Sequence, residues 1–118
     1  MQNDLRLAIW VTALLALVIA GLTLMPSVPG PAMVNGQDKI NHFIAFAALS
    51  LPISMARPRW ILAAAVVMTL FGGLIEIIQP YVGRGREFGD LVADMLGIAA
   101  GAGLGLLGNR LLRRLRNA

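Results

Sequence analysis

Four long apolar runs limit what this chain can fold into. They cover residues 7–25, 40–56, 60–79 and 90–109, and each approaches the ~20 apolar residues that a helix needs to cross a bilayer core of ~30 Å. The chain is 58% hydrophobic and 14% charged, whereas soluble domains are about 45–50% apolar and about 25% charged. The sequence therefore predicts an all-α integral membrane protein, a four-helix bundle with short connecting loops, in a single domain over residues 1–118.

Polar segments that contain proline separate the runs. They cover residues 26–38, 57–59 and 80–89, and proline ends a helix because it lacks a backbone N–H. The first run could instead be a signal peptide that is cleaved near Pro31 or Ala32. It is longer than the ~7–15 apolar residues of a signal-peptide core, and only one positive charge precedes it, so we expect a retained span.

Basic residues are divided unequally between the two ends of such a bundle. Four spans place both termini and the turn at residues 57–59 on one side, with the loops at 26–38 and 80–89 on the other. The first side carries seven basic residues and the second carries three, which by the positive-inside rule places both termini in the cytoplasm. The seven are Arg6, Arg57, Arg59, Arg110, Arg113, Arg114 and Arg116, and the three are Lys39, Arg84 and Arg86. Since these charges lie at segment ends, we expect no nucleic-acid partner.

The acidic residues have the opposite distribution. Of the six Asp and Glu residues, only Asp4 lies on the side predicted to be cytoplasmic. The others accompany His42 on the outer side, and they are Asp38, Glu76, Glu87, Asp90 and Asp94. Ionisable side chains within a span are costly in lipid and normally face the interior of the bundle. The sequence thus predicts a polar pocket that opens toward the outside.

Within the spans, the polar and small residues follow helical spacing. Positions three or four apart share one face of a helix. The resulting stripes are Asp38 and His42, then Gly72, Glu76 and Gln79, then Asp90, Asp94, Gly97, Gly101 and Gly105. The last three glycines form a ladder that allows helix backbones to approach closely in lipid. A second copy of the chain could use this face to form an oligomer.

We expect the outer polar residues to form a site that combines acid–base groups with binding groups. Glu76 and the Asp38–His42 pair are the candidate catalytic acid and base. Arg84 and Arg86 lie among glycines, and the planar guanidinium suits phosphate or carboxylate ligands. The complete set of candidate binding residues is Lys39, Gln79, Arg84, Arg86, Asp90 and Asp94.

Structural roles are open for the same residues. His42 can be a hydrogen-bonded interior histidine, and Glu76 can fix the third span by pairing with an arginine of the next loop. Gln79 can cap a helix end, and Asp90 can be a first-turn acid stabilised by the helix dipole. The acids and the histidine could bind a divalent cation. Nothing in their spacing requires one, so we expect no metal and no cofactor.

Four short motifs resemble the VanZ-like family of small bacterial membrane proteins, over roughly residues 36–108. They are Asp38-Lys39-x-x-His42-Phe43, Glu76-x-x-Gln79, Gly83-Arg84 and Asp90-x-x-x-Asp94-x-x-Gly97. The family usually has asparagine at the position of Asp94, so this chain adds an acid there. The resemblance implies a multi-pass protein of the bacterial inner membrane, and the founding members are associated with teicoplanin resistance.

Three functional hypotheses follow. In the first, the outer pocket binds or modifies an amphiphile, such as an envelope precursor, a membrane lipid or a lipophilic glycopeptide. In the second, the protein is a non-catalytic scaffold whose charged residues form an ion-pair lock between spans. The third is a proton or small-solute transporter. Four spans without an inverted repeat are few for that task.

Overall fold

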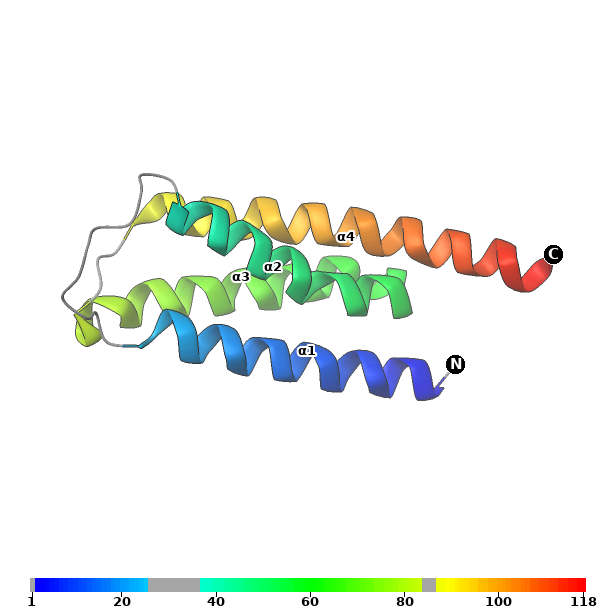
Figure 1. Cartoon of the computed structure of the whole chain (residues 1–118), viewed down its shortest axis with the longest axis horizontal. Coiled ribbons are helices and arrows are strands. Elements are labelled where there is room, and N and C mark those ends of the chain that lie inside the picture. The colour runs from blue at the N-terminus through cyan, green and yellow to red at the C-terminus, as the bar shows by residue number, and fades with distance from the viewer. Residues whose placement is uncertain (1, 26–36, 84–86) are drawn as a thin grey trace.

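The computed structural model describes residues 2–25, 37–83 and 87–118, and the regular structure in these ranges is entirely helical. The helices are α1 (Gln2–Thr23), α2 (Gln37–Ala56), α3 (Ile61–Ile78) and α4 (Phe88–Asn117), with the short 3-10 helices η1 (Pro58–Trp60) and η2 (Gln79–Val82) on either side of α3 (Figure 1). Each of the four α-helices is long and apolar enough to cross a membrane. The all-α class and the four predicted helices are therefore confirmed.

The four helices run along the long axis of a molecule that measures 55 × 24 × 22 Å (Figure 1). Both chain termini lie at one end, which we call the termini end. At the opposite end α2 and α4 begin and α1 and α3 finish, and we call this the polar end. The short turn at η1 keeps α2 and α3 together at the termini end.

The helix boundaries differ from the apolar runs at several places. Helix α4 continues to Asn117 instead of ending near residue 109, and its 30 residues span ~45 Å at the usual rise. Helix α2 begins at Gln37, before the apolar run. Both ends of the predicted loop over residues 80–89 are helical, since η2 covers its start and α4 begins at Phe88. Hydropathy marks the apolar part of a helix, whereas polar residues can extend the helix beyond it.

Large apolar side chains cover the outside of this bundle. Leu62, Trp10 and Leu17 are each more than 70% exposed, whereas Phe46 and Leu49 are buried in the small core between the helices. Contiguous apolar surface of this kind is rare on soluble monomers. The interior is correspondingly narrow, and small residues bring two of the helices close together.

That close approach is between α2 and α4, through the predicted glycine ladder. A Cβ on Gly97 would overlap the carbonyl oxygen of Phe43, and a Cβ on Gly101 would overlap that of Ala47. A Cβ on Gly105 would lie 2.6 Å from Ser54 Cβ in the next part of α2, and all three glycines are buried. Helix α2 of the same chain occupies this face. The glycine face of α4, through which we expected an oligomer, is therefore not a free surface in this structure.

Two hydrogen bonds reinforce the contact between α2 and α4. Ser50 Oγ donates to the carbonyl oxygen of Ile98 at 3.1 Å, and Asn109 Nδ2 donates to that of Met55 at 2.7 Å. The helices are thus held together from the middle of the bundle to the termini end. At the polar end, the same alignment places the first turns of α2 and α4 opposite each other.

Candidate functional site

Polar side chains from three helices meet inside the polar end. They come from the first turns of α2 and α4 and from the last turn of α3 with η2. His42, Glu76, Gln79, Asp90 and Asp94 are all buried, and Asp94 has no exposed surface at all. Charged side chains this deep in an apolar bundle need partners. The contacts of each side chain therefore decide what chemistry it can carry out.

The shortest contact of this group joins His42 to Asp94. His42 Nδ1 lies 2.7 Å from Asp94 Oδ1, and both side chains are buried. An ionised carboxylate can only accept a hydrogen bond, so with Asp94 ionised the proton lies on Nδ1. Sequence spacing predicted Asp38 as the carboxylate that holds the histidine, but Asp94 on α4 is much closer. The aspartate at this position is therefore an integral part of the cluster.

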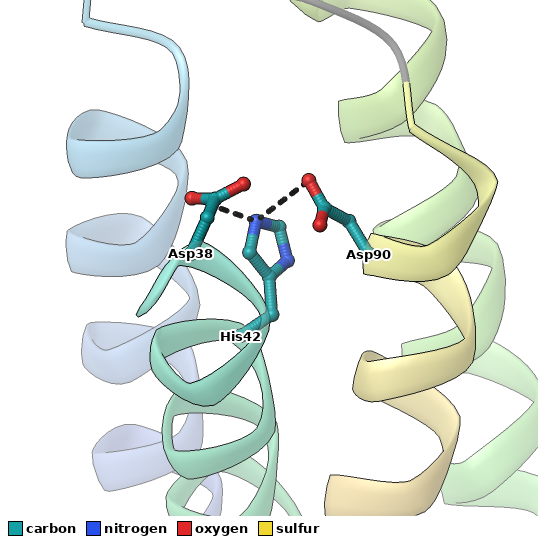
Figure 2. A group of neighbouring side chains, drawn as sticks. All are labelled: Asp38, His42 and Asp90. Atoms are coloured by element: carbon teal, nitrogen blue, oxygen red, sulfur yellow. Dashed lines mark ion pairs between the residues drawn. The ribbon is translucent and has the colours of Figure 1, made fainter. Parts of the chain in front are cut away.

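The other ring nitrogen of His42 faces two more aspartates. His42 Nε2 lies 3.7 Å from Asp90 Oδ2 and 3.9 Å from Asp38 Oδ1, and Figure 2 shows the imidazole between the two carboxylates. Both distances exceed that of a hydrogen bond. Asp38 is partly exposed, whereas Asp90 is buried. Among the described residues, Asp38, His42 and Asp90 form the group whose geometry could hold a metal ion.

Lys39 crosses from α2 to α4 on the outer side of this group. Its Nζ lies 2.6 Å from Glu87 Oε2 and 3.6 Å from Asp90 Oδ1. Within residues 2–25, 37–83 and 87–118, Asp90 Oδ1 is buried without a hydrogen bond. Gly89 makes room for the lysine, because a Cβ there would lie 2.7 Å from Lys39 Cε. Lys39 is half-exposed, so its charge can reach the surface of the polar end.

Glu76 and Gln79 belong to α3 and η2 and make different contacts. Glu76 Oε2 accepts a hydrogen bond from the backbone N–H of Glu87 at 3.2 Å, which ties α3 to the residue before α4. Gln79 Nε2 donates to the carbonyl oxygen of Thr23 at 3.2 Å. Gln79 thereby supplies a hydrogen-bond donor to a carbonyl oxygen at the end of α1. It therefore caps α1 and not the helix that precedes it in sequence, α3.

Gly72 has a role that its place in the α3 stripe did not reveal. A Cβ on this residue would lie 2.6 Å from Asp94 Oδ2, so the carboxylate of Asp94 fits against α3 only because residue 72 is glycine. The sequence indicated only that Gly72 lies on the same helix face as Glu76, four residues before it, and not which side chain it would contact.

The structure brings together five of the predicted site residues, and these are Asp38, Lys39, His42, Asp90 and Asp94. Glu76 joins them through the backbone of Glu87, and Gln79 contacts α1 instead. Arg84 and Arg86 lie outside the described residues. Glu87 was not among the predicted site residues. The signal for it was Lys39, a cation predicted to lie at the same end of the bundle, where an acid would be needed as its partner.

Two cavities lie elsewhere in the bundle. One, of about 420 Å³, is lined mainly by apolar side chains of α1, α2 and α3, among them Leu49, Met68 and Phe71. The other, of about 520 Å³, lies at the termini end beside Arg57 and Arg113. Neither is lined by His42 or by the carboxylates around it.

No family model matches this chain, and no curated protein or solved structure matches it. The likeness to VanZ-like proteins therefore depends on the four motifs alone.

Proposed function

We propose that the protein is a VanZ-like, multi-pass protein of a bacterial cytoplasmic membrane, with both termini in the cytoplasm and the polar end outside. Four apolar helices with a mostly apolar outer surface support insertion into lipid. The excess of arginine near the termini supports the orientation. Membrane lipids are then the direct partners of the exposed leucine, valine and isoleucine side chains.

We further propose that the polar end binds or modifies an amphiphile of the cell envelope, such as an envelope precursor or a lipophilic glycopeptide. The observation that carries this proposal is the buried contact of 2.7 Å between His42 and Asp94. A carboxylate on Nδ1 orients an imidazole and stabilises the imidazolium that forms when Nε2 takes a proton. A histidine held in this way is suited to act as a general base.

The other residues of the polar end have roles that follow from their positions. Lys39 is half-exposed beside Asp90, so its ammonium group can attract an anionic headgroup toward His42 Nε2. Glu76 is buried beneath the start of α4 and is the candidate proton donor. Resistance to a lipophilic glycopeptide would follow if modification of an envelope precursor altered the target of the drug, or if binding at the polar end removed the drug itself.

The test compares His42→Gln and Glu76→Gln with the native protein in a bacterial host. The readouts are the envelope lipid profile by mass spectrometry and the teicoplanin concentration that inhibits growth. Both variants should lose the effect of the native protein while reaching the membrane in equal amounts. Asp4→Asn, at the termini end, is the matched control and should retain that effect. If both variants retain it at native abundance, the catalytic role is wrong.

A scaffold is the second candidate function, because every ion pair described at the polar end except the one between Asp38 and His42 joins α2 to α4 or to Glu87, the residue before α4. The Lys39–Glu87 pair is the shortest of those that include a lysine. Exchanging the two charges, with Lys39→Glu and Glu87→Lys together, should restore any stability that either single variant loses. Restored stability together with native activity of His42→Gln would favour the scaffold over the catalyst.

A further inference from the structure

We propose that Asp38, His42 and Asp90 bind a divalent transition-metal ion through one carboxylate oxygen from each aspartate and through His42 Nε2. The three ligand atoms lie within 4.8 Å of one another and converge on a common point between α2 and α4 (Figure 2). This site revises the expectation that no metal is bound. It does not require that the polar end act on an amphiphile, and while the ion is bound His42 Nε2 is a ligand and cannot serve as the general base.

The separations within the group are close to those of a metal site. Ligands at ~2.1 Å from a tetrahedral metal ion lie about 3.4 Å from one another. The measured separations from His42 Nε2 are 3.7 Å to Asp90 and 3.9 Å to Asp38. Binding therefore requires each of these two oxygens to move a few tenths of an ångström closer to Nε2. The two oxygens, which lie within 4.8 Å of each other, must also approach, and rotation of the two aspartate side chains can supply both movements.

Asp94 prepares His42 for this role. It occupies Nδ1 at 2.7 Å, so with Asp94 ionised the lone pair of the neutral imidazole lies on Nε2, between the other two carboxylates. A histidine that binds a metal usually donates its second N–H to a carboxylate in this manner, which fixes the ring and its tautomer. Asp94 would be this supporting residue, one step removed from the metal.

Asp90 gives independent support for a bound cation. Its side chain is buried, and its Oδ1 makes no hydrogen bond within the described ranges, since Lys39 Nζ is 3.6 Å away. A buried carboxylate oxygen without a hydrogen bond is unfavourable, and the longer ion pair with Lys39 offsets this only in part. In addition, the neutral His42 directs a lone pair at Asp90 Oδ2 and not an N–H. A positive ion between Nε2 and Oδ2 would pair with the imidazole lone pair and neutralise the charge of the buried carboxylate.

The donor set selects the kind of ion. Imidazole suits Zn²⁺ and other first-row ions, and carboxylates suit Zn²⁺ and Mn²⁺, whereas Mg²⁺ and Ca²⁺ prefer ligands that are all oxygen. The chain has no cysteine, so a thiolate site is excluded. Three protein ligands leave a coordination position for water or a ligand oxygen, as in catalytic zinc sites.

The full chain can test this proposal directly because it contains one histidine. The protein, purified in detergent without a histidine tag and stripped with a chelator, is titrated with Mn²⁺ and followed by electron paramagnetic resonance. We expect one ion per chain, nitrogen modulation of the Mn²⁺ signal from a single imidazole, and displacement by Zn²⁺ but not by an equal concentration of Mg²⁺. Absence of saturable binding, or binding without the nitrogen signal, would overturn the proposal.

Variants then separate the metal site from a purely structural cluster. Asp38→Asn is the primary variant, because Asp38 is partly exposed and its replacement disturbs the fold least. It should weaken Mn²⁺ binding at least tenfold, and Asp94→Asn should weaken it by about 10–100-fold, as for other supporting residues. His42→Gln should remove the nitrogen signal, and Asp4→Asn should change nothing. Native affinity in a folded Asp38→Asn protein would contradict the assigned ligands. Metal binding with no lipid or resistance effect would reject only the proposed function.

Discussion

At the scale of single residues, His42 shows how tertiary structure overrides local spacing. Asp38 is four residues away on the same helix, yet its carboxylate lies 3.9 Å from the ring. Asp94 is 52 residues away in sequence and lies at 2.7 Å. The spacing of polar residues predicted that they would gather, but it could not rank partners on different helices. That ranking depends on how closely α2 and α4 approach and on the absence of a side chain at Gly72.

Gly72 offers a sharp test of this packing. In Gly72→Ala, the new Cβ would lie 2.6 Å from Asp94 Oδ2, so the carboxylate or α3 must move. We expect the free energy of unfolding, measured by detergent titration, to fall by about 1–3 kcal/mol. Gly73→Ala is the matched control, because nothing lies within 4 Å of its Cβ. Equal stability of the two variants would show that Asp94 does not pack against α3 as described.

At the scale of helices, the apolar runs predicted the number and order of the elements, and the glycine spacing predicted one close contact. The partner in that contact was not predictable, because a small-residue ladder fits any helix that presents a matching backbone. Helix ends were also missed. The arginines that follow residue 109 extend α4 to Asn117, since arginine favours helix and needs no apolar surroundings.

Gly101 tests the contact between α2 and α4. A Cβ at this position would overlap Ala47 O and Ser50 Oγ, so Gly101→Ala should push the two helices apart. We expect a loss of about 1–3 kcal/mol in the free energy of unfolding, and a weaker His42–Asp94 contact, which nitrogen-15 NMR of the single imidazole can follow. In Gly103→Ala the new Cβ meets nothing within 4 Å, and stability should not fall. A stable Gly101→Ala protein with an unchanged imidazole spectrum would contradict this packing.

At the scale of the whole molecule, the charges at the two ends of the bundle are as uneven as the sequence indicates. The arginine-rich part of α4 lies at the termini end, and the acidic cluster lies at the polar end. Sequence alone could predict this polarity because four helices joined by short turns must alternate in direction. It could not predict that the cluster would be closely packed, since packing depends on side chains that meet only after the helices associate.

This polarity predicts the orientation of the protein in the membrane. By sequence, seven basic residues belong to the side predicted to carry the termini and three to the other side, which favours retention of the termini in the cytoplasm. The chain has no cysteine, so single cysteines can report each side. Tyr81→Cys and Leu115→Cys replace exposed residues at the polar end and the termini end, respectively. In intact cells, a membrane-impermeant maleimide should label the first and reach the second only after permeabilisation. The reverse pattern would place the acidic cluster in the cytoplasm, where it could not meet an amphiphile of the outer leaflet.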